Sequence, residues 1–281
     1  MRRLGGTRRA SGGALARFHG TGEAHGDQAS VSLFPRHPAV VNATTIFPKS
    51  VVRASHSRRL FPSGEHQAKL GKVVLKGPWA GLPIFTFSLE ERASCPTSCH
   101  VWRACYGNGM PLARRHRIED EADRRAIFEA LAVLCHEHRH TGLVLRLHVL
   151  GDFLDVDYAT RWQDALIQHA GLHIFGYTAH KRTSFVGAIV REMNQAMPDR
   201  CAIRFSHESK AGWEEPMGAT TYWGDSLPPL GIPCPQQTEK TLTCGTCGAC
   251  WSEATRDRTI VFRGHGNPFL LRGPGGRKPR K

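Results

Sequence analysis

Seven of the nine cysteines of this 281-residue chain fall in two short runs, and thiols at such close spacing are typical ligands of a metal ion or an iron–sulfur cluster. The first run has the spacing C-x3-C-x5-C and consists of Cys95, Cys99 and Cys105. The second has the spacing C-x9-C-x2-C-x2-C and consists of Cys234, Cys244, Cys247 and Cys250. Disulfides are the alternative, but a chain of this length can bury a core without them, and neither a signal-peptide pattern nor a long apolar run suggests secretion. We therefore expect bound metal, a cytoplasmic location and no membrane contact.

The first run leaves the identity of the metal open. Three cysteines can hold three irons of a [4Fe–4S] cluster and leave the fourth iron for a substrate or cofactor. Structural zinc normally has four protein ligands, so a zinc ion here would need His100 or a remote residue as its fourth. We favour the [4Fe–4S] cluster and keep zinc as the alternative.

The second run is the sharper pattern. Ferredoxin-type [4Fe–4S] sites take three ligands from C-x2-C-x2-C and the fourth from a remote Cys-Pro, which Cys234-Pro235 supplies here. Gly245 and Gly248 allow the backbone to wrap closely around the sulfurs. A four-cysteine zinc knuckle has the same ligand count, so zinc and a second [4Fe–4S] cluster both remain open at this run.

Strands and helices alternate between the two runs, which predicts parallel strands joined by crossover helices. The expected strands are 82–89, 143–150, 173–178, 201–206, 219–223 and 259–263, and the expected helices are 111–138, 158–170 and 184–197. In the last helix, spacing predicts an inward face made of Phe185, Ile189, Met193 and Met197. Six strands are too few for a closed eight-fold barrel, so we expect an α/β fold with a partial, open βα barrel.

The chain divides into five predicted parts. They are a disordered basic arm (1–30), a basic irregular wrap with one short strand at 73–76 (31–76), the partial βα barrel (77–227), a cysteine-rich metal or cluster knuckle with the last strand (228–262) and a disordered basic tail (263–281). Residues 1–76 carry 13 Lys or Arg and 3 Asp or Glu, and residues 263–281 carry 6 and none, within a chain of net charge +14. Basic flanks around a nearly neutral middle predict nucleic acid as a partner, with solubility as the alternative explanation.

Polar residues gather at the carboxyl ends of successive predicted strands, where the active sites of βα barrels lie. Period-two geometry places Arg146 and His148 on one face of the strand 143–150, and Asp152 lies in the turn that follows it. An ordinary turn or helix cap is the alternative role for Asp152. The catalytic candidates at this mouth, which we expect the Cys95 loop to share, are Arg146, His148, Asp152, Tyr177 and Arg204.

This arrangement resembles the radical S-adenosylmethionine enzymes over roughly residues 82–207, although Cys99 and Cys105 are further apart than in that family's standard motif. The resemblance implies that Cys95, Cys99 and Cys105 bind a [4Fe–4S] cluster whose open iron binds S-adenosylmethionine. It further implies that Gly151 and Asp152 contact the amino group of that cofactor. At the C-terminal run, a cluster would resemble the auxiliary clusters that some of these enzymes carry.

More specifically, the chain resembles the phage gene product 88 family over most of residues 70–252. The matching features are the Leu-Glu-Glu-Arg lead into Cys95-Pro, Cys105-Tyr106-Gly107, the Gly151-Asp152-Phe153 turn, Gly176-Tyr177-Thr178 and the C-terminal cysteine pattern. The resemblance implies a phage or prophage origin. We therefore predict an iron–sulfur protein resembling radical S-adenosylmethionine enzymes, with a substrate that the sequence does not name. The alternative is a zinc-stabilised protein, not an enzyme, that binds nucleic acid.

Overall fold

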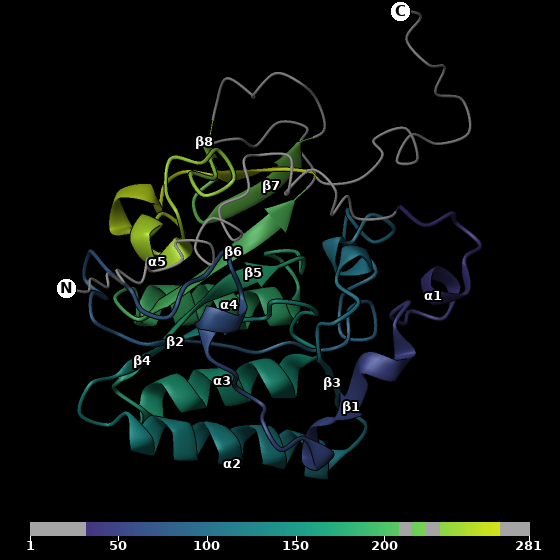
Figure 1. Ribbon diagram of the computed structural model, residues 1–281, viewed down its shortest axis with the longest axis horizontal. Coiled ribbons are helices and arrows are strands. Elements are labelled where there is room, and N and C mark those ends of the chain that lie inside the picture. The colour runs from purple at the N-terminus through teal and green to yellow at the C-terminus, as the bar shows by residue number, and fades with distance from the viewer. Residues whose placement is uncertain (1–31, 208–214, 223–230, 265–281) are drawn as a thin grey trace, which may run out of the picture.

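The computed structural model describes residues 32–207, 215–222 and 231–264 (Figure 1). The predicted disordered arm at 1–30 and the predicted tail beyond residue 264 lie outside the described residues.

Seven parallel strands form one sheet that curls into an open half-barrel (Figure 1). In spatial order they are β2 (Ile84–Thr86), β4 (Leu143–Leu147), β5 (Leu172–Thr178), β6 (Cys201–His207), β7 (Gly218–Tyr222), β9 (Ile260–Arg263) and β8 (Ile232–Pro233). Every neighbouring pair in this order is parallel. The expected open βα barrel is confirmed. The strand of this sheet that the sequence did not predict is β8, which is too short to leave a pattern in the sequence.

Three helices cover one face of this sheet: α2 (Glu121–Glu137), α3 (Val156–Gln168) and α4 (Phe185–Ala196) (Figure 1). Each begins after a side chain that accepts a hydrogen bond from the first turn, which satisfies an amide the helix itself cannot pair. The caps are Asp120, Asp155 and Ser184. At the start of α3, Asp155 accepts this bond from the Tyr158 amide at 2.9 Å.

Two expectations about these helices are wrong. The helix expected from residue 111 begins ten residues later, because Arg115–Arg117 forms strand β3 beside β1 (Val51–Arg53). Those arginines pair with buried glutamates, and this pairing outweighs the helical pattern around them. Phe185, expected on the inward face of α4, is 84% exposed because it is the first residue of the helix and lies beyond the edge of the core.

The core consists of two layers, one on each side of the sheet. Between sheet and helices, the layer contains the odd-numbered β4 residues Leu143, Leu145 and Leu147. On the concave side, Val144 of β4 packs with Phe175 of β5 and other residues of a smaller cluster. Successive residues of a strand point to opposite faces, so each strand contributes to both layers.

The remaining elements are short. They are α1 (Pro38–Val41), α5 (Cys244–Cys247) and single 3₁₀ turns at Pro48–Ser50, Ala54–His56, Gly64–His66, Tyr106–Gly109 and Glu253–Thr255. The strand expected at 73–76 reduces to one isolated bridge between Val73 and Pro83. The described part of the basic wrap, residues 32–76, is otherwise irregular apart from β1 and these short turns.

Gly176 fixes how closely β5 approaches β4. A Cβ atom at this position would lie 1.7 Å from the Leu147 carbonyl oxygen, a separation that no small shift of a side chain can relieve. We therefore expect Gly176→Ala to lower the free energy of unfolding by about 3 kcal/mol or more through overpacking. Urea unfolding measures the loss. Gly171→Ala is the control, because its Cβ would come no closer than 3.2 Å to another residue; equal losses in the two variants would contradict the prediction.

Candidate functional site

The first cysteine loop leaves the carboxyl end of β2 and folds around the buried side chain of Arg92. Arg92 has a left-handed backbone (φ 66°) and is 2% exposed. Its guanidinium donates to the carbonyls of Trp102 and Thr44, each at 3.0 Å, and to the side chain of Asn108. One buried arginine therefore sets the path of the loop that carries Cys95, Cys99 and Cys105.

The two glutamates before Arg92 tie this loop to the N-terminal wrap. Glu91 accepts from Arg115, with the Nε–Oε2 pair at 2.6 Å, and from the Thr45 hydroxyl at 2.7 Å. Glu90 accepts from Arg117 Nε at 2.7 Å. The carboxylates of both glutamates are about 1% exposed, so each needs a cationic partner to offset the cost of burial. The Glu-Glu-Arg part of the Leu-Glu-Glu-Arg motif thus supplies the buried ion pairs and hydrogen bonds that support the cysteine loop.

The three thiols of this loop are free and half-buried, and they lie within electrostatic reach of one another. Burial and, to a smaller extent, the neighbouring Cys105 together raise the pKa of Cys99 to about 12. Burial likewise raises the pKa of Cys105, to about 11, with Glu91 adding to the shift and Arg92 opposing it. The pKa of Cys95 is raised by burial and then by Asp152, Cys99 and Cys105. The loop therefore gathers three thiols that stay protonated at neutral pH unless a cation binds them.

Asp152 braces the turn that faces the cysteine loop. Its two carboxylate oxygens accept from the amides of Phe153, at 2.7 Å, and Ala179, at 2.6 Å, which joins the ends of β4 and β5. Burial raises its pKa while His180 and the two amides oppose the shift. The Asp152 amide donates to Ser94 Oγ at 3.2 Å, so the turn and the cysteine loop share one mouth, as the sequence predicts.

Gly151 allows this close approach. Its φ is +80°, and a Cβ atom would lie 2.5 Å from Ser94 Oγ and 2.7 Å from Leu89 Cβ. Only glycine fits a left-handed position pressed against the neighbouring loop in this way.

The second cysteine run is attached to the same half-barrel by Arg204 of β6. Cys234 follows β8, and the other three cysteines lie in and just after α5. Arg204 is fully buried and donates to the carbonyls of Cys250 at 2.9 Å, Thr255 at 2.9 Å and Arg258 at 2.8 Å. It also reaches the carbonyls of Gly218 and Ala249, both at 3.3 Å. Arg204 is one of the predicted catalytic candidates, and its donors bind backbone carbonyls of the segment that carries the second cysteine run.

Tyr177 and Arg146 lie between the two cysteine runs. The Tyr177 hydroxyl is 2.7 Å from Cys250 Sγ, and the Arg146 guanidinium lies over the Tyr177 ring at 4.6 Å. Burial raises the pKa of Cys244, and Arg146 opposes that shift. Desolvation raises the pKa of Tyr106, next to Cys105, and Arg146 opposes that shift too. Arg146 therefore lies within electrostatic reach of both runs. Tyr106 is not among the residues predicted for the site, although its position directly after Cys105 was a usable signal.

His148 does not join this group. β4 ends at Leu147, so the period-two pattern that would put His148 beside Arg146 stops one residue too early. His148 Nε2 lies 3.0 Å from the Tyr158 hydroxyl, and its ring meets Phe153 edge-on in the layer under the helices. Burial lowers its pKa to about 3, which suits a neutral core histidine.

In the described part of the chain, no group of three or more His, Cys, Asp or Glu side chains has an arrangement that could hold a metal ion. The structure thus brings Cys95, Cys99, Cys105, Gly151, Asp152, Arg146, Tyr177 and the second cysteine run to one mouth, but it does not place the sulfurs at ligating positions. The metal at each run remains a prediction.

The fold and this mouth define an α/β protein built on an open parallel half-barrel, with two cysteine runs at the carboxyl ends of its strands. The profile of the family described as Gene product 88 matches residues 54–222, more than half of the chain, so the chain belongs to this phage-related family. The match includes the first cysteine run and ends before the second. Searches of curated proteins and of solved structures found no match. No helix among the described residues is long and apolar enough to cross a membrane.

Arg204→Met should loosen the segment of the second cysteine run from the half-barrel. It leaves several buried carbonyls without a donor, so we expect a loss of about 3 kcal/mol or more in the free energy of unfolding. Arg204→Lys should recover only part of this, because an ammonium cannot reproduce the planar fork of donors. Urea unfolding followed by tryptophan fluorescence measures both, with Arg125→Met on the exposed side of α2 as the control. Equal stability of the Met and Lys variants would contradict the role assigned to the guanidinium.

Two buried histidines should make the fold acid-sensitive. Burial lowers the pKa of His116 to about 4 and of His148 to about 3, against about 6.5 in an unfolded chain. Between those values the unfolded state binds more protons, so stability is complete above about pH 6.5 and falls as the pH drops towards 4. For His116 alone the loss approaches about 3 kcal/mol. Urea unfolding at pH 7.5, 6 and 5 should show a shallower pH slope in His116→Gln than in the wild type, whereas exposed His140→Gln should keep the wild-type slope.

Proposed function

We propose that this protein is an iron–sulfur protein whose cluster or clusters lie at the carboxyl-end mouth of the half-barrel. Cys95, Cys99 and Cys105 would hold a [4Fe–4S] cluster with three thiolates. Cys234, Cys244, Cys247 and Cys250 would hold a second cluster or a zinc ion. The observation that carries the proposal is the pair of arginines, Arg146 and Arg204, that lies against these cysteines without a carboxylate partner.

Arg204 is buried and Arg146 is partly buried, and the described residues give neither arginine an ion pair, although buried charges are normally paired. Burial lowers the pKa of Arg204, and Cys250 is the first group that opposes this shift. A thiolate at Cys250 would supply the missing negative charge. A protonated thiol would not, and burial raises the pKa of Cys250 to about 11, so the thiolate form requires a bound cation.

The donor chemistry of the first run also fits a thiolate-bound cluster. Arg92 opposes the raised pKa of Cys99 and Cys105, and Arg115 does so for Cys105, so cations already surround this loop. The sulfurs would have to draw together on binding, which is common where metal-binding energy completes the folding of a loop. Three protein ligands leave one iron of a [4Fe–4S] cluster for another molecule.

The resemblance to radical S-adenosylmethionine enzymes suggests that molecule. When bound, such a cluster supplies a single electron to it. The residues of this chain would act around it: Arg146 faces the mouth from β4 and could contact a carboxylate, and Tyr177 positions Cys250. Asp152 is already bonded through both oxygens to backbone amides, so its main role is to shape the turn beside the cofactor.

Anaerobic purification with measurement of iron, acid-labile sulfide and zinc tests the proposal. We expect about four irons and four sulfides for each cluster. Cys99→Ala should remove one cluster's worth of iron while the second run keeps its metal, and Cys247→Ala should remove the second metal and lower the melting temperature. Cys135→Ala is the control, because this thiol lies in the helix-side core.

Zinc without sulfide at both runs would overturn the iron–sulfur proposal and favour the zinc-stabilised, nucleic-acid-binding alternative. Metal content that is unchanged in Cys99→Ala and Cys247→Ala would overturn the assignment of ligands. Protein without iron, sulfide or zinc after anaerobic purification would overturn metal binding itself.

A further inference from the structure

Two stretches of the chain that pack against each other beside the mouth contain no acidic residue. Residues 32–64 and 92–118 each contain five Lys or Arg and no Asp or Glu. The Leu33 amide donates to the Arg103 carbonyl at 3.0 Å, which joins the start of the first stretch to the first cysteine loop. Further along, β1 pairs with β3, and α1, β1 and β3 lie together at one side of the half-barrel (Figure 1).

Four cations of these two stretches have no carboxylate partner. Arg36, Lys49 and Arg114 are exposed, and Arg103 is half-buried. None of the four forms an ion pair with another residue that the structure describes. The carboxylates that follow β3 pair with Arg53 instead. The four charges are therefore free to meet an anionic partner.

The buried side chain of Arg115 connects these cations to the cysteine loop. Its guanidinium donates to Ser50 Oγ at 2.9 Å and to the Gly107 carbonyl at 3.0 Å. Lys49 directly precedes Ser50, and Tyr106 directly precedes Gly107. One guanidinium thus holds an exposed lysine and the residue after Cys105 in the same region of the surface.

Two aromatic residues of these stretches are exposed. Phe34 is 58% exposed, and its ring meets the His37 ring edge-on at 5.2 Å. Tyr106 is 44% exposed, although burial raises the pKa of its hydroxyl, which lies within electrostatic reach of Arg146 and Cys105. The hydroxyl therefore lies on the inner side, and the ring is the accessible part. We call these two aromatic residues and the four cations the rim: Phe34, Arg36, Lys49, Arg103, Tyr106 and Arg114.

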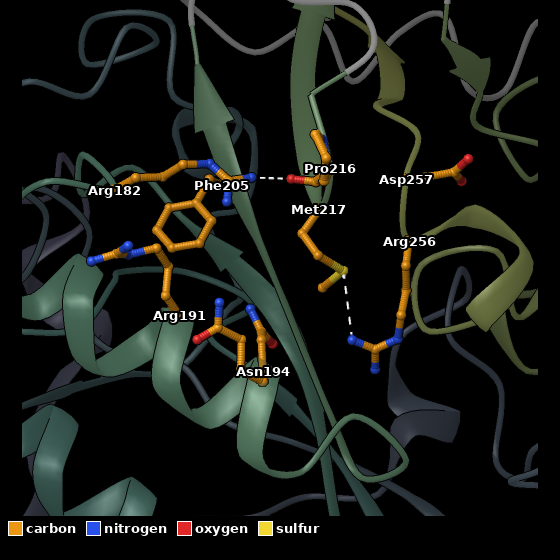
Figure 2. A pocket seen from close by; sticks show the side chains of 9 residues that line it. Arg182, Arg191, Asn194, Phe205, Pro216, Met217, Arg256 and Asp257 are labelled. Atoms are coloured by element: carbon orange, nitrogen blue, oxygen red, sulfur yellow. Dashed lines mark hydrogen bonds between the residues drawn. The ribbon is translucent and has the colours of Figure 1, made fainter.

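The free cations distinguish the rim from another arginine-rich place, a cavity of about 350 Å³ between α4, β6 and β7 (Figure 2). There, Arg182 donates to the Pro216 carbonyl and forms an ion pair with Glu215 at 2.6 Å. Arg256 donates to the Cys201 carbonyl at 2.8 Å. These guanidinium groups already have partners within the protein, so we look to the rim for a charged ligand.

Exposed rings among unpaired cations suit a single strand of nucleic acid. Its phosphates follow the positive charges, and its unpaired bases stack on aromatic side chains whatever their sequence. A duplex offers no free base face, and the longest helix in the two stretches, α1, has four residues and is too short to read a groove. An acidic protein would complement the charges alone.

We propose that the rim binds single-stranded nucleic acid, with bases stacked on Phe34 and Tyr106 and the backbone held by the four cations. Because Tyr106 follows Cys105, the strand places a base at the entrance to the mouth. A base or nucleotide of that strand is then the substrate. This naming of the substrate rests on the proposed function, whereas the binding itself does not.

Fluorescence anisotropy of the full-length protein with a labelled single-stranded DNA of about 12 nucleotides, and with the matching duplex, tests the charge part of the proposal. We expect tighter binding of the single strand and a loss of affinity as salt rises. The double variant Lys49→Glu and Arg114→Glu should weaken binding at least about tenfold, because two phosphate contacts are lost. Arg125→Glu with Arg191→Glu makes the same charge change on exposed positions of α2 and α4 and should leave the affinity unchanged.

The stacking part is tested at Phe34, whose exposure makes its substitution harmless to the fold. Phe34→Ala should weaken binding of the single strand at least about fivefold, and Phe34→Trp should restore it, because a larger ring still stacks. Phe185→Ala removes an 84% exposed ring from α4 and is the control. The chain termini are the same in all variants, so their contribution cancels in each comparison.

Equal affinities for the single strand and the duplex would overturn the proposal, and so would equal weakening by the two double charge variants. An affinity unchanged in Phe34→Ala would remove the stacking role and leave the charges to an acidic protein, which also overturns it. These titrations measure neither iron nor sulfide nor zinc. Their failure would therefore leave the iron–sulfur proposal untouched, and protein without iron could still show the binding.

Discussion

The buried guanidinium of Arg204 is the constraint on which the mouth of the half-barrel depends. It emerges from the concave side of β6 and donates to backbone carbonyls of residues 218, 249, 250, 255 and 258. Only a side chain with several donors in a planar fork can meet so many carbonyls at once. The segment that follows the last helical crossover therefore packs back onto the sheet although no helix in its described part is longer than one turn. The second cysteine run takes its place opposite the first as a consequence.

The first cysteine loop follows the same principle with a different arginine. Arg92 donates to two carbonyls and an amide oxygen of the segments around it, while Arg115 and Arg117 neutralise the glutamates beneath. In both places long cationic side chains satisfy irregular backbone that neither helix nor sheet can pair. The thiols of the two runs form no disulfides. Backbone amides contact several of them and the Tyr177 hydroxyl contacts Cys250, so the sulfurs remain available for a ligand.

The alternating strands and helices could be predicted from the sequence. The features that depend on contacts of single side chains could not. Alternating strands and capped helices from β2 to β6 follow from hydrophobic period and capping residues, and the shared mouth follows from parallel strand direction. The start of α2 could not be found in this way, because the Glu90–Arg117 and Glu91–Arg115 pairs join residues more than 20 positions apart. The roles of Arg204 and His148 were hidden for a related reason. A polar residue at a strand end looks the same in sequence whether it faces a substrate or binds the backbone, and only the position of the strand's last residue decides where His148 points.

Arg146 gives the two cysteine runs a common electrostatic environment. In the proposed metal-bound state, thiolates bound to a cluster or to zinc would leave net negative charge at each run, and two such groups at one mouth would repel each other in a medium of low dielectric constant. A guanidinium between them, stacked on Tyr177 and within reach of Cys244 and Tyr106, offsets that repulsion for both. Gly176 makes this placement possible, because any larger residue would press on the Leu147 carbonyl and the Arg146 guanidinium. The Gly176-Tyr177 pair and Arg146 thus form one unit, in which the glycine provides the space, the tyrosine contacts the thiol and the arginine supplies the charge.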